Sequence, residues 1–189
     1  PTPVTLVRGD HVGSSTCKPC HEERHATWAN SYHRTMTQVA TPETTLGLGS
    51  GSVVARGREH LLEVRDGAVW ASQVGQEGEE RPLTLLTGSH RMQAYWVSDG
   101  EGGHELLPFT WLVNDQRMVP RDAVFLRSGA AEPAEPMRWQ YACMACHTVG
   151  ARARYDATTA SQEVRVAELG VACEACHGPG RKHVDAQRE

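Results

Sequence analysis

Six cysteines and three histidines of the chain stand in three copies of one short pattern, C-x-x-C-H. The three copies are CKPCH (Cys17, Cys20, His21), CMACH (Cys143, Cys146, His147) and CEACH (Cys173, Cys176, His177). No cysteine lies outside them. The composition would produce about 0.01 such patterns by chance in a chain of this length. Thiols and imidazoles at this spacing can form half of a zinc site, a thiol–disulfide switch or an attachment point for haem.

Covalent attachment of haem explains both the spacing and the histidine. The two thiols can add to the vinyl groups along one porphyrin edge, and the histidine that follows can ligate the iron from the proximal side. A zinc ribbon needs paired C-x-x-C units, whereas the first copy would be unpaired, and a thioredoxin-like switch needs a βαβ pattern that the sequence lacks. The sequence therefore predicts three covalently bound haem c groups, with His21, His147 and His177 as proximal ligands.

The cofactor and the composition limit where the protein acts and what it binds. Because haem c is attached outside the cytoplasm, we expect a periplasmic or extracellular protein. The chain begins at Pro1 without a signal-like apolar segment, so we interpret it as a mature form whose signal peptide has been removed, or as a trimmed chain. It has no run of about 18 apolar residues that could cross a membrane. The formal net charge of -4, without a dense stripe of Lys or Arg, argues against nucleic-acid binding.

Seven histidines outside the motifs are candidates for distal ligands: His11, His25, His33, His60, His90, His104 and His183. The stretch STCKPCHEERHATWANSYHRTM, residues 15–36, predicts one helix. On that helix His25 lies one turn from His21 on the proximal side, which favours a surface position or a contact with a propionate. His33 would lie about 18 Å along the helix from His21 and could serve another haem.

Two terminal stretches carry a family resemblance that covers most of the chain. VGSSTCKPCHEERHATWANSYH resembles the opening of many bacterial multihaem c-type cytochromes, and CEACHGPGRKHV is similar to their C-H-G-P-G-x-x-H element. That group includes the tetrahaem electron acceptor of hydroxylamine oxidoreductase, from which this chain departs in having three attachment sites. The resemblance implies distal roles for His33 and His183, with Gly178, Pro179 and Gly180 redirecting the chain toward a neighbouring haem.

The other histidines are weaker candidates. His90, in GSHRMQ, is the third choice for a distal ligand. His11 lies on an N-terminal arm that is either disordered or able to reach a haem of a neighbouring subunit. His60 and His104 stand beside glycine-rich, turn-forming stretches and are expected on the surface.

The secondary structure expected around these haem-binding residues indicates an α+β chain in three parts. Residues 1–40 form an arm and the first haem helix, residues 41–128 a small antiparallel β insert, and residues 129–189 a segment of short helical pieces that carries two haems. Hairpins are predicted at Asp66-Gly67 and in MQAYWVSDGEGGHELLPFTWLV, and a further turn at Asn114-Asp115. Residues 41–52 and 129–136 read as linkers. Only 39% of the residues are hydrophobic, so we expect the haems to fill part of the core.

Haems whose iron already has two protein ligands favour electron transfer over catalysis. We expect a carrier that relays electrons between extracytoplasmic redox partners, or between copies of itself in a homo-oligomer or filament, with no catalytic residues of its own. The alternative is a multihaem oxidoreductase in which one haem keeps an open coordination position and acts on a small nitrogen compound.

Overall fold

The computed structural model describes residues 4–76, 78–124 and 137–189 of the chain. Its helices are α1 (Ser14–Cys17), α2 (Glu22–Ala29), η1 (Arg121–Ala123, a 3-10 helix), α3 (Trp139–Ala142), α4 (Met144–His147), α5 (Cys173–His177) and α6 (Arg181–Ala186). Its strands are β1 (Thr5–Leu6), β2 (Thr37–Val39), β3 (Val53–Ala55), β4 (Arg58–Arg65), β5 (Ala68–Gln73), β6 (Arg81–Thr87), β7 (Met92–Ser98), β8 (His104–Leu112), β9 (Arg117–Pro120), β10 (Thr148–Val149), β11 (Arg152–Asp156), β12 (Ser161–Val166) and β13 (Glu168–Leu169).

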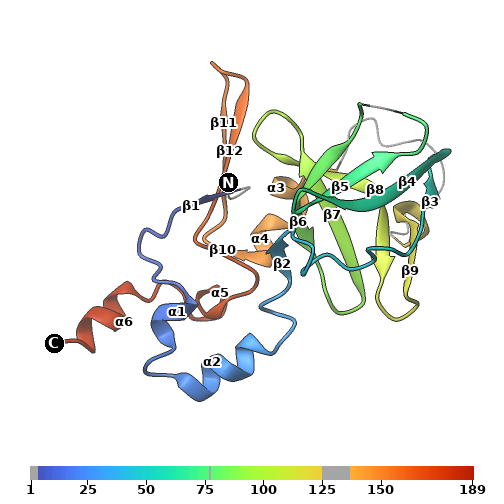
Figure 1. Cartoon of the computed structure of the whole chain (residues 1–189). Coiled ribbons are helices and arrows are strands. Elements are labelled where there is room, and N and C mark those ends of the chain that lie inside the picture. The colour runs from blue at the N-terminus through green and yellow to red at the C-terminus, as the bar shows by residue number, and fades with distance from the viewer. Residues whose placement is uncertain (1–3, 77, 125–136) are drawn as a thin grey trace.

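An antiparallel sheet forms one half of the molecule, and short helices from both ends of the chain form the other (Figure 1). The strands follow the order β3-β4-β5-β6-β7-β8-β9, and β2 adds to β6. Helices α1 and α2 lie close to α5 and α6, although about 150 residues separate them in sequence. The α+β class is confirmed.

Turn chemistry sets the register of the central strands. Asp66 and Gly67 join β4 to β5 with φ angles of 51° and 75°, the left-handed pair that a two-residue hairpin requires. The predicted second hairpin is β7–β8, and the predicted turn at Asn114-Asp115 joins β8 to β9. All three predicted hairpin connections are confirmed.

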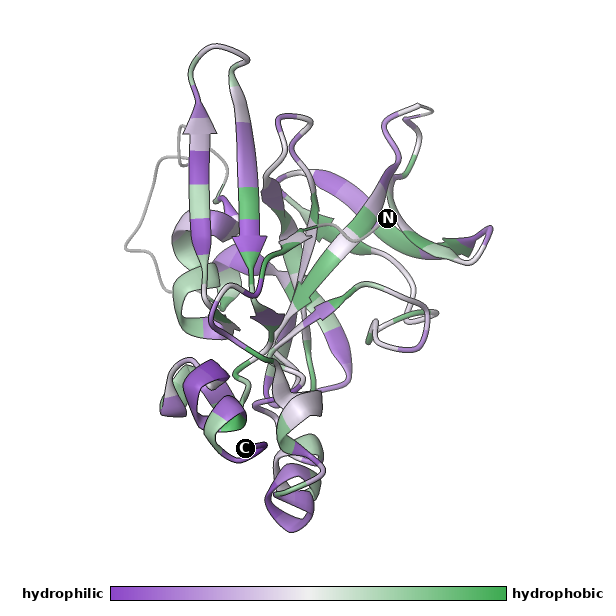
Figure 2. Cartoon of the chain, turned by 90° about the vertical axis from the view of Figure 1, so that its left-hand side faces the viewer, coloured by the Kyte–Doolittle hydropathy of each residue, from purple (hydrophilic) through white to green (hydrophobic). Residues whose placement is uncertain are grey.

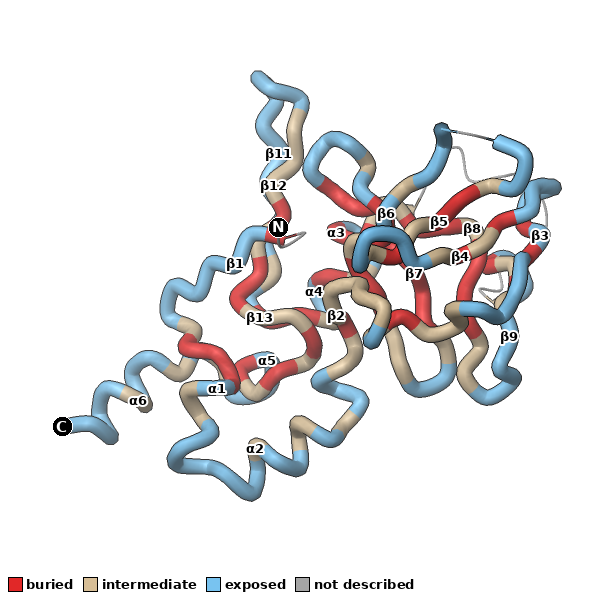
Figure 3. The backbone as a smooth tube through the Cα atoms, viewed as in Figure 1, coloured by how far each residue is buried: buried red, intermediate tan, exposed pale blue. Residues whose placement is uncertain are grey.

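Two larger apolar clusters hold most of the core, and a third, small one consists of Val149, Ala167 and Ala172. Of the larger two, one lies inside the curved sheet and includes Tyr95, Phe109 and Leu86, all fully buried. The other lies between the sheet and the C-terminal segment, where Trp96 of β7 packs with Trp139 of α3. Buried residues therefore concentrate on the strands (Figure 3), and hydrophobic residues run along them (Figure 2).

The predicted helix over residues 15–36 is wrong. It is split by a turn at Lys18–Cys20 and ends at Ala29. A tertiary contact replaces further helical turns, because the carbonyl of His33 accepts the N–H of Val171 at 2.9 Å. Gly170 allows this approach, since a Cβ there would lie 2.4 Å from the carbonyl oxygen of Arg34.

The C-terminal part contains more strand than the sequence suggested. β11 and β12 form a hairpin that projects from the body, and β1 pairs with β12 in parallel (Figure 1). β10 pairs with β13 and brings the second and third motifs together along the chain. The prediction of short helical pieces holds for α3 to α6 only. The predicted linker at 129–136 lies outside the described residues.

The predicted linker at 41–52 packs on the sheet. The Tyr95 hydroxyl donates to the carbonyl of Leu46 at 2.8 Å, and the Gln93 amide oxygen accepts the N–H of Leu46 at 2.8 Å. A Cβ at Gly47 would lie 2.6 Å from the Trp111 ring. This segment therefore closes one end of the sheet core.

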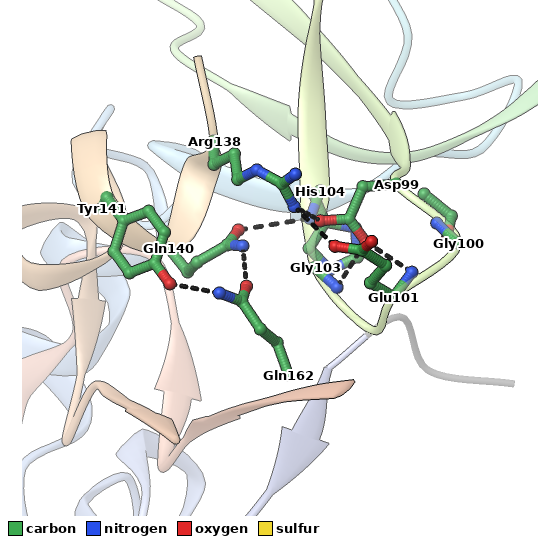
Figure 4. Close-up of polar contacts among 10 residues, drawn as sticks. Asp99, Gly100, Glu101, Gly103, His104, Arg138, Gln140, Tyr141 and Gln162 are labelled. Carbon is green, nitrogen blue, oxygen red and sulfur yellow. Dashed lines mark hydrogen bonds and ion pairs between the residues drawn. The ribbon is translucent and has the colours of Figure 1, made fainter. Parts of the chain in front are cut away.

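A charged contact joins the sheet to the C-terminal segment (Figure 4). Arg138 donates to Oδ2 of Asp99 at 2.6 Å and lies 3.4 Å from a carboxylate oxygen of Glu101. The other oxygen of Asp99 accepts the backbone N–H groups of Glu101 and Gly103. The buried Asp99 carboxylate therefore shapes the β7–β8 loop and holds the segment before α3 against it.

An amide chain continues this contact to the projecting hairpin (Figure 4). Oε1 of Gln140 accepts the backbone N–H of His104 at 3.2 Å, while its amide nitrogen donates to Gln162. The Gln162 side chain in turn donates to the Tyr141 hydroxyl, and its backbone N–H donates to the carbonyl of Glu101 at 2.6 Å. Sheet, α3 and hairpin thus share one polar network.

Candidate haem sites

Each C-x-x-C-H motif forms about one helical turn. The N–H of His21 donates to the carbonyl of Cys17 at 3.0 Å, and that of His147 donates to Cys143 at 3.1 Å. Helical turns place residues i, i+3 and i+4 on one face. Both thiols and the imidazole of a motif therefore point to the same side, as attachment and ligation of one haem require.

The two thiols of each motif differ in their exposure to solvent. The first cysteine of every motif is half-buried and the second is exposed, and none of the six forms a disulfide. Burial raises the pKa of the Cys143 thiol to about 11, with a smaller contribution from Cys146. The Cys143 thiol is therefore protonated near neutral pH, which does not fit a reactive thiolate at this position.

The first and third motifs share one cavity of about 720 Å³. Cys17 and His21 line it on one side, and Cys173, Cys176 and His177 on the other. The helices around it contribute little core of their own, since neither α2 nor α6 contains a buried residue (Figure 3). Isolated helices of eight and six residues are marginal in water. A large apolar cofactor in this cavity would supply the surface that they lack.

The rings of His21 and His183 face each other across this cavity. Their centroids lie 6.2 Å apart with 25° between the ring planes. Two imidazoles on one metal would have centres roughly 6 Å apart, because each metal–nitrogen bond is about 2 Å long and each ring centre lies about 1 Å further out. The centroid distance between His21 and His183 is therefore close to that of two imidazoles on one metal.

The first thioether positions of the two motifs are neighbours. Burial raises the pKa of Cys17, and the Cys173 thiol raises it further through its charge and a side-chain hydrogen bond. Haems attached at these two cysteines would therefore approach each other at their vinyl edges.

The second motif lies between the sheet and the shared cavity. Nδ1 of His147 is buried without a hydrogen-bond partner among the described residues. Burial lowers the pKa of this imidazole, and the backbone of Met36 opposes the shift in part. A neutral ring is the form that binds a metal. The site therefore suits a proximal ligand held against backbone of the first haem segment.

The structure places His33 and His25 at the shared cavity together. His33 follows α2 in a turn, so it reaches the cavity through the contact with Val171 and not along a helix. His25 meets the Trp28 ring edge-on at 5.3 Å between centroids. Because Trp28 also donates to the carbonyl of Val171 at 2.9 Å, α2 is anchored beside the third motif.

His90 and His11 lie elsewhere. The exposed His90 ring stacks on Tyr32, with centroids 4.1 Å apart and 5° between planes. His11 has a defined place, with Nδ1 3.1 Å from the carbonyl oxygen of Arg8 and its ring beside Gly150, three residues after His147. His11 therefore lies close to the second motif of its own chain.

Sequence reasoning misplaced the two histidines of the sheet. His60 and His104 are 6% and 3% exposed, not on the surface. His60 points into the sheet core, where its ring lies 5.4 Å from Phe109, and His104 bonds the Thr84 hydroxyl at 3.0 Å. The glycines that suggested surface loops border strands whose histidines face inward.

Sequence reasoning also missed Glu174, inside the third motif. This carboxylate is 5% exposed and accepts the backbone N–H groups of Val12, Gly13 and Gly180 at 2.7 to 3.1 Å. Burial alone would raise its pKa, but these three donors lower it overall, helped by His11. Glu174 thus ties the residues before the first motif to those before His183. The only feature of the sequence that pointed to it was an acidic side chain at a motif position that can hold any residue type.

The part of the chain that the structure describes shows neither a separate metal site nor a membrane-spanning helix. No group of three or more His, Cys, Asp or Glu side chains is arranged there to hold a metal ion. None of its helices is long and apolar enough to cross a membrane.

Comparisons with known proteins agree with this geometry. A family model described as cytochrome c554 and c-prime matches residues 117–178, which contain the complete second and third motifs. No curated protein matches the chain in sequence. The family match covers about a third of the chain and includes two of its three C-x-x-C-H motifs, which supports covalently bound haem c.

Two solved structures share the fold. The outer cell wall cytochrome OcwA superposes with a TM-score of 0.59 and 18% identity, over 95% of this chain and 34% of that protein. The undecahaem cytochrome from the S-layer of Carboxydothermus ferrireducens gives a TM-score of 0.56 and 18% identity, over 97% of this chain and 22% of that protein. The chain thus spans about a third and about a fifth of two larger multihaem cytochromes.

Proposed function

We propose that the chain carries three haem c groups and relays electrons between redox partners outside the cytoplasm. The observation that carries the proposal is the pair of His21 and His183, 6.2 Å apart across a cavity lined by two attachment motifs. Two histidines saturate an iron, so such a haem exchanges electrons without binding a substrate.

The contact between Cys17 and Cys173 supports a relay. Electrons pass readily between haems whose edges touch, and these two sites share one cavity. The second motif joins them through β10 and β13, since β13 ends four residues before Cys173. Three haems on 189 residues would form a short chain of cofactors.

Distal ligands for the other two irons are part of the proposal. His33 lines the cavity that contains His177, which favours it for the third haem. His11 lies beside Gly150, three residues after the second motif, which favours a role at that motif over a ligand role between subunits. His90, stacked on Tyr32, is the remaining candidate.

The two structural neighbours are described as an outer cell wall cytochrome and an S-layer cytochrome. Both descriptions support a periplasmic or extracellular location for this chain, reached after removal of a signal peptide. The partners that fit are other redox proteins or further copies of the chain in an oligomer or filament.

Magnetic circular dichroism of the oxidised protein tests the proposal, followed by addition of nitrite, hydroxylamine and cyanide. An electron carrier gives bis-histidine, low-spin signals from all haems and binds these molecules poorly. A persistent high-spin haem that binds nitrite or hydroxylamine and turns it over would contradict the electron-carrier function and favour an oxidoreductase.

A further inference from the structure

Besides the cysteines and histidines, the three haem motifs contain two ionisable side chains, those of Lys18 and Glu174. Lys18 is exposed, whereas Glu174 is buried. Glu174 follows Cys173 directly, and it belongs to the lining of the cavity that the first and third motifs share. A buried carboxylate therefore lies in the wall of the space that would hold two haems.

Neutral groups hold this carboxylate in place. Its oxygens accept the backbone N–H groups of Val12, Gly13 and Gly180 at 2.7 to 3.1 Å. The guanidinium of Arg8 lies beside Gly13, but it donates to the carbonyl of Val12 at 2.6 Å. Hydrogen bonds from N–H groups stabilise the ionised form of a carboxylate without cancelling its charge. The negative charge of Glu174 can therefore act on the cavity.

The effect of this charge reaches the first motif. Burial raises the pKa of the Cys17 thiol most, and the charges of Cys173 and Glu174 raise it further. In the second motif, burial and the neighbouring Cys146 account for the raised pKa of Cys143. The field that disfavours a thiolate at Cys17 would also act on the iron of a haem attached there, because both are Coulomb interactions with the same charge.

A buried negative charge changes the affinity of a haem for an electron. Reduction adds an electron to the iron, so a carboxylate close by disfavours the reduced form. The interaction is screened less in the protein interior than at an exposed position. Charge and burial around a haem are among the means by which a protein adjusts its reduction potential.

The same side chain fixes the backbone beside two candidate distal ligands. The N–H of Val12, which Glu174 accepts, belongs to the residue after His11. The N–H of Gly180 belongs to the N-cap of α6, the helix that carries His183. One carboxylate thus holds both segments and places its charge at the third motif.

We propose that Glu174 is a positioning residue that lowers the reduction potentials of the haems at the first and third motifs, because its buried carboxylate places a fixed negative charge beside both attachment sites. This inference rests on the proposed function, since it requires a haem at each of these motifs. A haem at the second motif would feel the charge less.

Spectroelectrochemical titration of the haem-loaded protein at pH 7 tests this, with the native chain and Glu174→Gln compared. Two of the three midpoint potentials should rise in the variant. We expect the equilibrium constant for reduction to increase roughly threefold to tenfold, which is about 30 to 60 mV for a one-electron step. Unchanged midpoints, or an equal rise in all three, would overturn the inference.

Glu168→Gln is the matched control for the loss of a backbone anchor. Glu168 is a half-buried carboxylate that accepts the backbone N–H and the hydroxyl of Ser14 at 2.9 and 3.0 Å, just before the first motif. It raises the pKa of Cys17 less than burial and Glu174 do. Its removal should therefore shift the midpoints less. Equal shifts would mean that the lost anchor, and not the buried charge, changes the potentials.

Glu174→Asp separates charge from anchoring in the opposite way. Aspartate keeps the charge, but its shorter side chain cannot reach all three backbone donors. The constants for reduction should stay within about twofold of the native values, although the protein becomes less stable. This variant also decides the matter if Glu174→Gln does not mature, since a rise as large as that expected for the glutamine variant would contradict a role of the charge.

The mass of each denatured preparation gives the number of bound haems. A native chain with fewer than three haems would contradict the proposed function itself. Three haems, with midpoints that do not respond to Glu174→Gln, would contradict only the role of Glu174.

Discussion

The imidazoles of His21 and His183 belong to motifs more than 150 residues apart, yet they face each other across one cavity. The motif spacing alone predicted His21 as a ligand, and a resemblance was needed to choose His183. The distance between the rings supports the proposal that His183 is the distal ligand. Spacing on the predicted helix favoured His33 over His25, but in the structure both line the cavity that the fold creates.

We expect His183→Ala to convert one haem to a high-spin state while all haems stay covalently attached. The iron would lose one of two nitrogen ligands, and the thioethers would be unaffected. Electron paramagnetic resonance of the oxidised protein measures the change. His25→Ala is the matched control, since His25 lines the same cavity, and it should leave the spectrum low-spin. A low-spin spectrum for His183→Ala, without a replacement ligand, would exclude the pair.

Glu174→Gln should lower the free energy of unfolding by about 1–3 kcal/mol, because an amide cannot satisfy the three backbone donors that the buried carboxylate accepts. Chemical denaturation at pH 7 measures the loss. Glu163→Gln, at an exposed pair with Arg165, should leave the midpoint nearly unchanged. Equal midpoints for the two variants would show that Glu174 does not hold the segments together.

The Glu174 carboxylate also makes the stability of the protein depend on pH, and the direction of this dependence follows from its lowered pKa. The folded protein lowers the pKa of Glu174 below its ordinary value of 4.5. Its contribution to stability is therefore complete above about pH 4.5 and is lost as the pH falls through the folded value. Denaturation midpoints between pH 7 and pH 3 should fall more steeply for the native chain than for Glu174→Gln. Parallel curves would contradict this.

Elements formed by local signals were predictable, and elements formed by distant contacts were not. Asp66-Gly67 specified its hairpin because the left-handed turn is a property of those two residues. The end of α2 depends on the bond between His33 and Val171, which no local pattern records. Strand β11 is exposed along its whole length, so it lacks the apolar alternation by which half-buried strands are recognised, and β12 shows it only at its end, at Val164 and Val166.

The contact between the sheet and this hairpin can be tested at two glycines. Gly102 and Gly67 have φ angles of 95° and 75°, so alanine at either costs about 1–2 kcal/mol in backbone strain. At Gly67 an added Cβ meets nothing within 4 Å, whereas at Gly102 it would lie 2.0 Å from the carbonyl oxygen of Gln162. Chemical denaturation should therefore show Gly102→Ala to be the more destabilising by about 1–3 kcal/mol. Equal losses would mean that the β7–β8 loop does not pack on β12.

For the whole molecule, a thin side-chain core and three attachment motifs have one explanation. The sheet carries its own apolar core, whereas α2 and α6 contain no buried residue and surround the shared cavity. Such helices need a cofactor to pack against, so the chain matured without haem should keep the sheet and lose the helical half. The chain matches about a third and about a fifth of the length of the two structural neighbours.

The mass of the denatured, matured protein tests the central claim most directly. Thioether bonds survive denaturation, so the account predicts the polypeptide mass plus three haem groups, one for each pair of cysteines. A mass equal to that of the bare polypeptide, or with fewer than three haems after complete maturation, would contradict it.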